Sequence, residues 1–304
     1  MSRYAAIDVG TNSVLLLVAE KQQGKFVAVA ERSEITRLGK GVDQRKQLAP
    51  DAIEATLTVI ERYAREAREL GAQQLVVSAT SAARDASNGR VFLDGAKARA
   101  GVEIEIISGD EEARLSFASA WSDFGGAQPL VVLDIGGGST EFIFGDGTAI
   151  SYRHSFDVGA VRMTERHIQS DPPSAYELDE LDASLAEKFA AVPKPPAHFR
   201  MVGVAGTVTT LAAVVLELAT YDPARIHGAV LSFDTLEHTV KRLQALPVHL
   251  RKTVPGIQEK RADVIVAGGR VLLAAMKTLD AKELTVSDRG LRWGLLADRF
   301  GGAV

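Results

Sequence analysis

Two short turns in the sequence carry residue types that suit phosphate chemistry. Asp8 leads into residues 10–13 (Gly-Thr-Asn-Ser), and Asp134 leads into residues 136–139 (Gly-Gly-Gly-Ser), so each turn follows a carboxylate and ends in a serine. Glycine lets the backbone approach phosphate oxygens closely, and consecutive N–H groups can form a nest around an anion. The serine hydroxyls would add donors. The turns therefore predict an anion site, with an ordinary hairpin turn as the alternative for either one alone.

Three carboxylates, Asp8, Asp134 and Glu141, flank these turns. Asp8 and Asp134 stand within apolar strand-like runs, where a charged group is costly without a partner. A Mg²⁺–phosphate site would supply that partner, because Mg²⁺ takes oxygen ligands and retains several waters. The alternative is ordinary turn chemistry, since aspartate is common in turns.

A further pair of carboxylates, Glu111 and Glu112, opens a helix at the end of a strand. The spacing from Ser108 to Glu111 is that of a capping box, which explains Glu111. No such role explains Glu112. A carboxylate that orients and deprotonates water is what phosphoanhydride hydrolysis requires, and Glu112 is the candidate.

Two further segments follow apolar strands, where α/β folds place ligands. Arg84 suits bidentate phosphate binding, although a solvated arginine at a helix start is the alternative. Gly206 and Thr207 begin a helix whose N-terminus could bind a phosphate, with close helix–strand packing as the alternative.

The elements that must position these groups repeat along the chain. Strands are expected over residues 4–18 (around the first turn) and 26–30, a helix from Pro50 to Gly71, strands at 75–78 and 102–107, and a helix after 108. The pattern starts again with strands at 130–134 and 141–144, and Asp134 follows Asp8 by 126 residues. This predicts a duplicated α/β domain. Helices at 234–246, 262–279 and after 291, with a strand at 283–287, complete the second half.

Both glycine turns continue into strands instead of helices. Dinucleotide and P-loop sites need a strand, a loop and then a helix, and no Walker lysine or G-x-G-x-x-G is present, so both are excluded.

Composition narrows the function further. The 304 residues predict two domains. With 35 basic and 39 acidic residues the net charge is −4, which argues against DNA or RNA as a partner. The absence of cysteine excludes disulfides, thiolate zinc sites and cysteine nucleophiles. No apolar stretch is long enough for a membrane span, and a cytoplasmic protein is expected. Two basic groups, at residues 37–46 and 251–261, are either solvated faces or local patches that steer a polyanion.

The ordered set of motifs resembles the exopolyphosphatase / guanosine pentaphosphate phosphatase (Ppx/GppA) family of the actin–sugar kinase–Hsp70 superfold. The matching segments span nearly the whole chain, at residues 6–13, 79–88, 107–115, 134–141, 159–165, 203–207, 255–263 and 287–292.

The resemblance implies two ribonuclease-H-like domains of α/β class, with the active site in the cleft between them. The first domain would cover residues 1–125 and the second residues 126–287, with the last helix, about 288–304, packing back on the first domain. Mg²⁺-dependent removal of a terminal phosphate is implied, with Mn²⁺ as another suitable metal, and a homodimer is a family-level expectation.

The site follows residue by residue. Glu112 matches the family's water-activating glutamate, and the expected metal ligands are Asp8, Asp134 and Glu141. The expected phosphate-binding residues are Asn12, Ser13, Arg84, Gly136, Gly137, Gly138, Ser139, Gly206 and Thr207. Two departures stand out: residues 14–16 are apolar where many relatives carry a basic residue, and Trp293 stands where a glutamate is common.

The predicted function is hydrolysis of the terminal phosphate of inorganic polyphosphate. Short chains should be favoured, because the sequence ends at Val304 without the extra helical region of longer relatives. Guanosine pentaphosphate is the alternative substrate. A non-catalytic polyphosphate or alarmone sensor and a sugar- or acetate-type kinase are the other classes considered.

Overall fold

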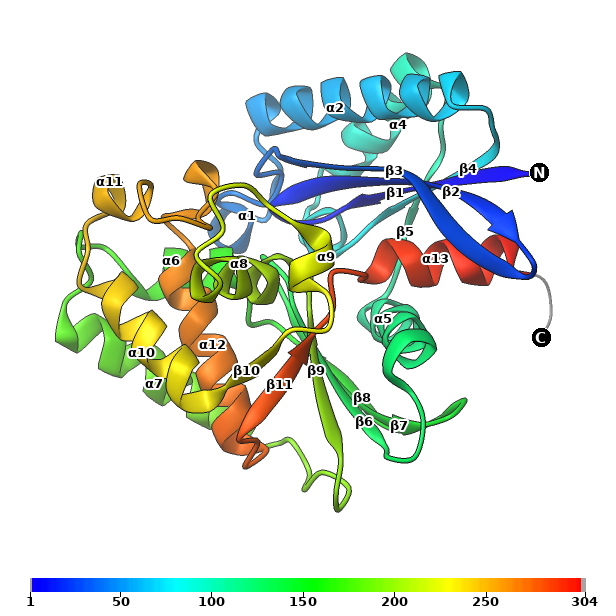
Figure 1. Ribbon diagram of the computed structural model, residues 1–304. Coiled ribbons are helices and arrows are strands. Elements are labelled where there is room, and N and C mark those ends of the chain that lie inside the picture. Colours follow the sequence, from blue (N-terminus) through cyan, green and yellow to red (C-terminus); the bar gives the residue numbers. More distant parts are fainter. Residues whose placement is uncertain (1, 302–304) are drawn as a thin grey trace. The chain divides into compact units, whose positions relative to one another are not determined.

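The computed structural model describes residues 2–301, which form two compact units (Figure 1). The first unit runs to Ser119 and takes up the chain again from Leu291, and the second spans Ala120–Gly290. The division falls inside helix α5 (Gly109–Phe124), slightly before the boundary expected from the sequence. Each unit has its own sheet and its own core.

The sheet of the first unit has five strands in the order β3-β2-β1-β4-β5. The strands β1, β2 and β3 form an antiparallel meander, whereas β4 and β5 continue the sheet parallel to β1. Their bounds are β1 Arg3–Val9, β2 Ser13–Gln22, β3 Lys25–Ile35, β4 Ala72–Ala79 and β5 Ile104–Ile106.

Two apolar clusters cover the two faces of this sheet. Side chains alternate along a strand, so Ala5 and Ile7 of β1 face one cluster and Ala6 faces the other. Helices α2 (Pro50–Glu69) and α4 (Gly89–Ala100) cover the first face. Helices α5 and α13 (Leu291–Phe300) contribute to the cluster on the second face. The short helices α1 (Val42–Arg45) and α3 (Ser81–Asp85) lie in the connections.

Helix α13 packs very closely on α5 within the first unit. A side chain at Gly294 would begin 2.0 Å from the carbonyl oxygen of Leu115, so only glycine fits at this crossing. Trp293 is buried in the same cluster, and its indole Nε1 donates to Glu31 at 3.4 Å. Arg292 binds the same carboxylate at 2.6 Å. The tryptophan that departs from the family pattern therefore contacts Glu31 of β3.

The second unit repeats the first and adds one strand. Its sheet has the order β10-β11-β9-β6-β7-β8, and β6, β7 and β8 again form an antiparallel meander with β9 and β11 parallel to β6. The order β8-β7-β6-β9-β11 thus matches β3-β2-β1-β4-β5 of the first unit, and β10 pairs antiparallel at the edge. The predicted α/β duplication and the ribonuclease-H-like fold class are confirmed. The strands are β6 Leu130–Ile135, β7 Thr140–Asp146, β8 Ala149–Phe156, β9 Arg200–Val204, β10 Val230–Ser232 and β11 Glu283–Val286.

Helices surround this second sheet and share one core with it. The apolar helix expected at 262–279 is α12 (Ile265–Thr278), and its buried face packs with side chains of α7, α8 and α10. Among residues 2–301 no helix combines the length and the apolar character that crossing a bilayer requires. The other helices are α6 Ala160–His167, α7 Ala175–Phe189, α8 Ala205–Val215, α9 Pro223–Ile226, α10 Phe233–Gln244, α11 Val248–Arg251 and the 3₁₀ turn Glu259–Arg261.

The contact of α13 on α5 predicts the effect of a single methyl group. Gly294→Ala should lower the free energy of unfolding by about 1–3 kcal/mol, because the added Cβ forces the two helices apart. Gly290→Ala is the control, since a Cβ there meets nothing within 4 Å. Urea unfolding of both variants measures the difference. Equal stabilities would show that the helices do not cross at this distance.

Candidate active site

The predicted site residues divide between the two units, and each set lies within its own unit. In both units they cluster where parallel strands end, which is the sheet edge at which α/β folds present ligands. The first unit holds Asp8, Asn12, Ser13, Arg84 and Glu112, and the second holds Asp134, Gly136, Gly137, Gly138, Ser139, Glu141, Gly206 and Thr207.

The two glycine turns have the same backbone geometry. Gly10 N donates to Ser13 O at 2.9 Å, and Gly136 N donates to Ser139 O at 3.0 Å. In each turn this bond closes the link between two antiparallel strands, β1 to β2 and β6 to β7. The sequence repeat therefore corresponds to a repeat in backbone conformation.

The carbonyl groups of both turns are engaged by the segment that follows the third strand. In the first unit, Thr11 O accepts from Gly39 N at 2.8 Å, and Asn12 O accepts from Arg37 N at 3.0 Å. In the second unit the residues at the N-terminus of α6 donate these hydrogen bonds. Gly136 O accepts from Ala160 N at 3.0 Å, Gly137 O from Val161 N at 2.9 Å, and Gly138 O from the buried Arg162 Nε at 2.6 Å.

This arrangement leaves amide groups of the second turn available. Within residues 2–301, no group accepts a hydrogen bond from the N–H of Gly137 or Gly138. Because the carbonyl oxygens are already held, the turn presents donors to any anion that approaches it. Gly159 makes the arrangement possible, since a side chain there would begin 2.4 Å from Gly137 O.

The carboxylates of the second unit lie in one row across the sheet. Asp134 of β6 is the register partner of Glu141 of β7, which in turn pairs with Ser155 of β8. Ser155 Oγ donates to Glu141 Oε1 at 2.6 Å, and both carboxylates are buried. Directly opposed residues in an antiparallel pair have Cβ atoms about 4.5–5.5 Å apart, and like charges there are unfavourable.

A divalent cation fits this pair. Its charge would offset two buried carboxylates, and their oxygens are the donors that Mg²⁺ prefers. Among the described residues no group of three or more acidic, histidine or cysteine side chains is placed to hold a metal. Waters and substrate phosphates would therefore complete the coordination, as Mg²⁺ commonly requires.

The corresponding row of the first unit has a different composition. Asp8 of β1 pairs with Leu15 of β2 and with Ser78 of β4, so leucine stands at the position that Glu141 holds in the second unit. Ser78 is fully buried, and its hydroxyl has no hydrogen-bond partner within residues 2–301. The side-chain amide nitrogen of Asn12 is also buried, and it likewise has no hydrogen-bond partner within residues 2–301. A buried polar group without a partner is costly, so both atoms suit a bound water or ligand.

Arg84 and Glu112 are brought together in the first unit. Arg84 follows β4 on α3, and Glu112 stands in the first turn of α5, just after β5. Arg84 Nη1 donates to Ile107 O at 2.9 Å and lies 3.6 Å from Glu112 Oε2. The predicted phosphate-binding arginine and the predicted proton acceptor thus lie side by side at one sheet edge.

Glu111 differs from its expected role in one respect. Its backbone N–H donates to Ser108 Oγ at 3.2 Å, as a capped helix requires. Its carboxylate instead forms two hydrogen bonds of 2.8 Å with Arg114, one turn further along the helix.

Gly206 and Thr207 begin α8 in a tightly packed environment. A side chain at Gly206 would begin 2.0 Å from the guanidinium of Arg261, and Thr207 is buried. Ala205 just before them has φ 68°, a left-handed conformation that is strained for alanine. The close neighbour of Gly206 is thus a charged side chain, and phosphate binding by Gly206 and Thr207 stays a prediction.

The second basic group, at residues 251–261, contains both buried and exposed side chains. Arg251 is 2% exposed and donates to Leu246 O and Ala262 O, each at 2.8 Å. Burial lowers the pKa of Arg261 to about 10, so this guanidinium still carries its charge at neutral pH. Arg251 is therefore enclosed by the second unit, whereas Lys252 and Lys260 of the same group are exposed.

These features are typical of enzymes that act on phosphates: a duplicated ribonuclease-H-like fold, two glycine turns and buried carboxylates beside them. Residues 17–301 match the model of the Ppx/GppA phosphatase family, and the chain belongs to that family. The predicted enzyme class, a phosphoanhydride hydrolase, is thereby confirmed.

Relatives match over almost the whole chain. "Exopolyphosphatase 2" of Mycobacterium tuberculosis is 37% identical, covering 97% of this chain and 98% of the relative. The solved structure of the Aquifex aeolicus Ppx/GppA family member is 33% identical with a TM-score of 0.84, covering 98% of this chain and 97% of that one. A guanosine-5'-triphosphate,3'-diphosphate pyrophosphatase of Photobacterium profundum is 27% identical, covering 96% of this chain and 58% of the relative.

The close approach of Gly159 to the second turn predicts a specific defect. Gly159→Ala should lower kcat/KM for phosphate release at least about 10-fold, because the new Cβ displaces Gly137 and misaligns its amide donors. Gly126→Ala in the same unit is the control, since a Cβ there meets nothing within 4 Å. A Gly159→Ala enzyme with unchanged kcat/KM would contradict a role of this turn in binding phosphate.

Proposed function

We propose that the chain removes the terminal phosphate of inorganic polyphosphate. Water attacks the terminal phosphorus, a new P–O bond forms, and the bridging P–O bond breaks to release inorganic phosphate and a chain shorter by one unit. Glu112 accepts the proton of the attacking water. The observation that carries the proposal is the conformation of the second turn, whose carbonyl oxygens are held by α6 while the N–H groups of Gly137 and Gly138 stay available.

Each group has a part in this reaction. The amide groups of the two turns and the Arg84 guanidinium bind phosphate oxygens, which carry the charge of a loose phosphoryl transition state. Arg84 also holds Glu112 in place through their 3.6 Å ion pair. Such a reaction needs mainly positioning and charge stabilisation, and these residues offer both.

A divalent metal is part of the proposal. Asp134 and Glu141 of the second unit would hold it, and Asp8 stays a predicted ligand from the family resemblance. Bound there, Mg²⁺ or Mn²⁺ would neutralise phosphate charge. The choice between the two metals is not fixed by oxygen ligands alone.

The relatives favour polyphosphate as the substrate. The relative named exopolyphosphatase is 37% identical and matches over 98% of its length, whereas the one named for guanosine pentaphosphate is 27% identical and matches over 58% of its length. Guanosine pentaphosphate is therefore the second candidate. The cytoplasmic location, the homodimer, the interdomain cleft and the preference for short chains stay predictions from the family resemblance.

Replacing Glu112 tests the proposed base. Glu112→Gln keeps the size of the side chain but removes the proton acceptor, and turnover of polyphosphate should fall about 10²–10⁴-fold. Phosphate release is measured with polyphosphate, guanosine pentaphosphate and ATP. Glu103→Gln is the control, because that side chain is 83% exposed and pairs with Lys97 at the surface.

The outcomes separate the alternatives. Undiminished turnover in Glu112→Gln would contradict the mechanism. Faster release from guanosine pentaphosphate than from polyphosphate would favour the second substrate. Tight binding without turnover by the wild type would favour a sensor, and ATP-dependent phosphorylation of a small acceptor would favour a kinase.

Removing one carboxylate of the second unit tests the metal site. Asp134→Asn should raise the Mg²⁺ concentration for half-maximal activity at least about 10-fold, because a charged oxygen ligand is lost. Binding of Mn²⁺, followed by electron paramagnetic resonance, should weaken in parallel. Asp146→Asn, at the exposed end of β7, is the control. An unchanged Mg²⁺ requirement in Asp134→Asn would exclude this residue as a ligand.

A further inference from the structure

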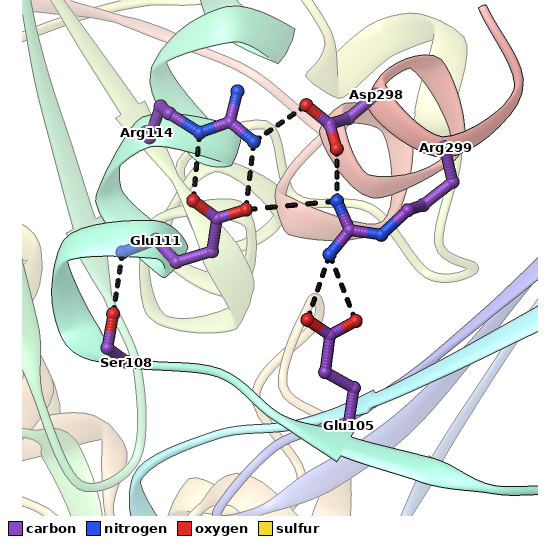
Figure 2. Close-up of polar contacts among 6 residues, drawn as sticks. All are labelled: Glu105, Ser108, Glu111, Arg114, Asp298 and Arg299. Atoms are coloured by element: carbon purple, nitrogen blue, oxygen red, sulfur yellow. Dashed lines mark hydrogen bonds and ion pairs between the residues drawn. The ribbon is translucent and has the colours of Figure 1, made fainter.

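We propose that an ion-pair network joining β5, α5 and α13 positions Glu112 for catalysis, so that Glu105, Glu111, Arg114, Asp298 and Arg299 are positioning residues of the active site. The inference rests on the proposed role of Glu112. Figure 2 shows the five positioning residues, together with Ser108, around the start of α5. All of them belong to the first unit.

The first turn of α5 needs support from outside the helix. The first N–H groups of any helix lack intrahelical partners, and this turn also carries three adjacent acidic residues, Asp110, Glu111 and Glu112. Ser108 supplies two contacts, accepting from Glu111 N with its hydroxyl and from Glu112 N with its carbonyl. Acidic residues suit a helix N-terminus, but neighbouring carboxylates repel one another. Cations beside this turn therefore matter for its conformation.

Arg114 supplies the first cation. Its guanidinium binds both oxygens of Glu111 at 2.8 Å, a bidentate geometry that fixes the carboxylate in orientation as well as distance. The same guanidinium reaches α13, where Nη2 lies 2.6 Å from Asp298 Oδ1. Hydrogen bonds from Arg114 hold the pKa of Glu111 below its usual range. The first turn of α5 is thus tied to the C-terminal helix.

Arg299 is the second cation, and it connects strand β5 to the network. It binds both oxygens of Glu105 on β5, at 3.0 and 2.9 Å, and it also contacts Asp298. Its Nη1 lies 3.9 Å from Glu111 Oε1. Hydrogen bonding to Glu105 raises the pKa of Arg299. The Arg299 side chain therefore links α13 to β5, the strand that precedes α5.

The network differs from the isolated surface pairs of this chain. Isolated exposed pairs contribute little, whereas bidentate, partly buried networks have defined geometry. Glu111, Arg114, Asp298 and Arg299 are 26–37% exposed and Glu105 is 49% exposed, whereas Arg90 and Asp94, a surface pair on α4, are 84% and 61% exposed.

The network acts on Glu112 through Glu111, its neighbour in the first turn of α5. Successive residues of a helix point about 100° apart, so Glu111 can face α13 while Glu112 faces Arg84. A rotation or fraying of the first turn would move both carboxylates together. A displacement of about 1 Å in a catalytic group can reduce the rate about 100-fold, so holding Glu111 protects the alignment of Glu112.

The test combines kinetics with a double-mutant cycle. Arg299→Met keeps the apolar stem and removes the guanidinium, and Glu105→Gln is a milder second variant at the same contact. With polyphosphate and Mg²⁺, kcat should fall about 10-fold or more in Arg299→Met and less in Glu105→Gln, with KM changed less than about 2-fold. Arg299→Lys should recover part of the loss. Arg90→Met, which breaks the surface pair on α4, should keep wild-type kcat.

A second measurement follows α5 directly. Amide hydrogen exchange of a peptide covering residues 108–117 should accelerate in Arg299→Met while the β-strands of both units keep their protection. In a Glu112→Gln background, Arg299→Met should cause no further loss, because the residue it positions is already disabled.

Three results would overturn the inference. They are wild-type kcat in Arg299→Met, equal fold losses in the wild-type and Glu112→Gln backgrounds, and unchanged exchange at residues 108–117. Full activity of the Glu112→Gln single variant would instead reject the proposed base, and the positioning role with it. The single variant therefore tells the two failures apart.

Discussion

The backbone hydrogen bonds of the glycine turns constrain much of this structure. Each turn closes on itself through a glycine N–H and a serine carbonyl, and each gives its other carbonyl oxygens to the segment that follows the third strand. In the second unit that segment is the start of α6, which can approach only because residue 159 is glycine. Hydrogen bonds therefore join the meander, the turn and the segment after the third strand, and in the second unit the turn presents amide donors at the sheet edge.

The duplicated fold provides the same framework twice, and the two copies have diverged in their charges. The second unit has two opposed carboxylates at Asp134 and Glu141, whereas the first has Asp8 beside Leu15. Arg84 and Glu112, in turn, stand on elements of the first unit. The opposed carboxylates are therefore a feature of the second unit, and the arginine–glutamate pair is a feature of the first.

Local patterns in the sequence identified the turns, the carboxylates and most long elements, because those features depend on neighbouring residues. Helix α4 was not predicted, since Gly89 and Gly95 weaken its local signal and the helix is stabilised by packing on α2. Ser78 and Ser155 gave no signal, because their roles depend on strand register. The burial of Arg251 was missed for the same kind of reason: a run of basic residues does not reveal which side chains the fold encloses.

In the proposed mechanism the backbone amides of the second turn bind substrate phosphate. The most direct test is nuclear magnetic resonance of the ¹⁵N-labelled chain, following the Gly137 and Gly138 amide signals during titration with polyphosphate and Mg²⁺. Both signals should shift downfield in a saturable way, and each amide nitrogen should show a scalar coupling to phosphorus. Unperturbed Gly137 and Gly138 signals, under conditions in which the enzyme is saturated with substrate, would contradict it.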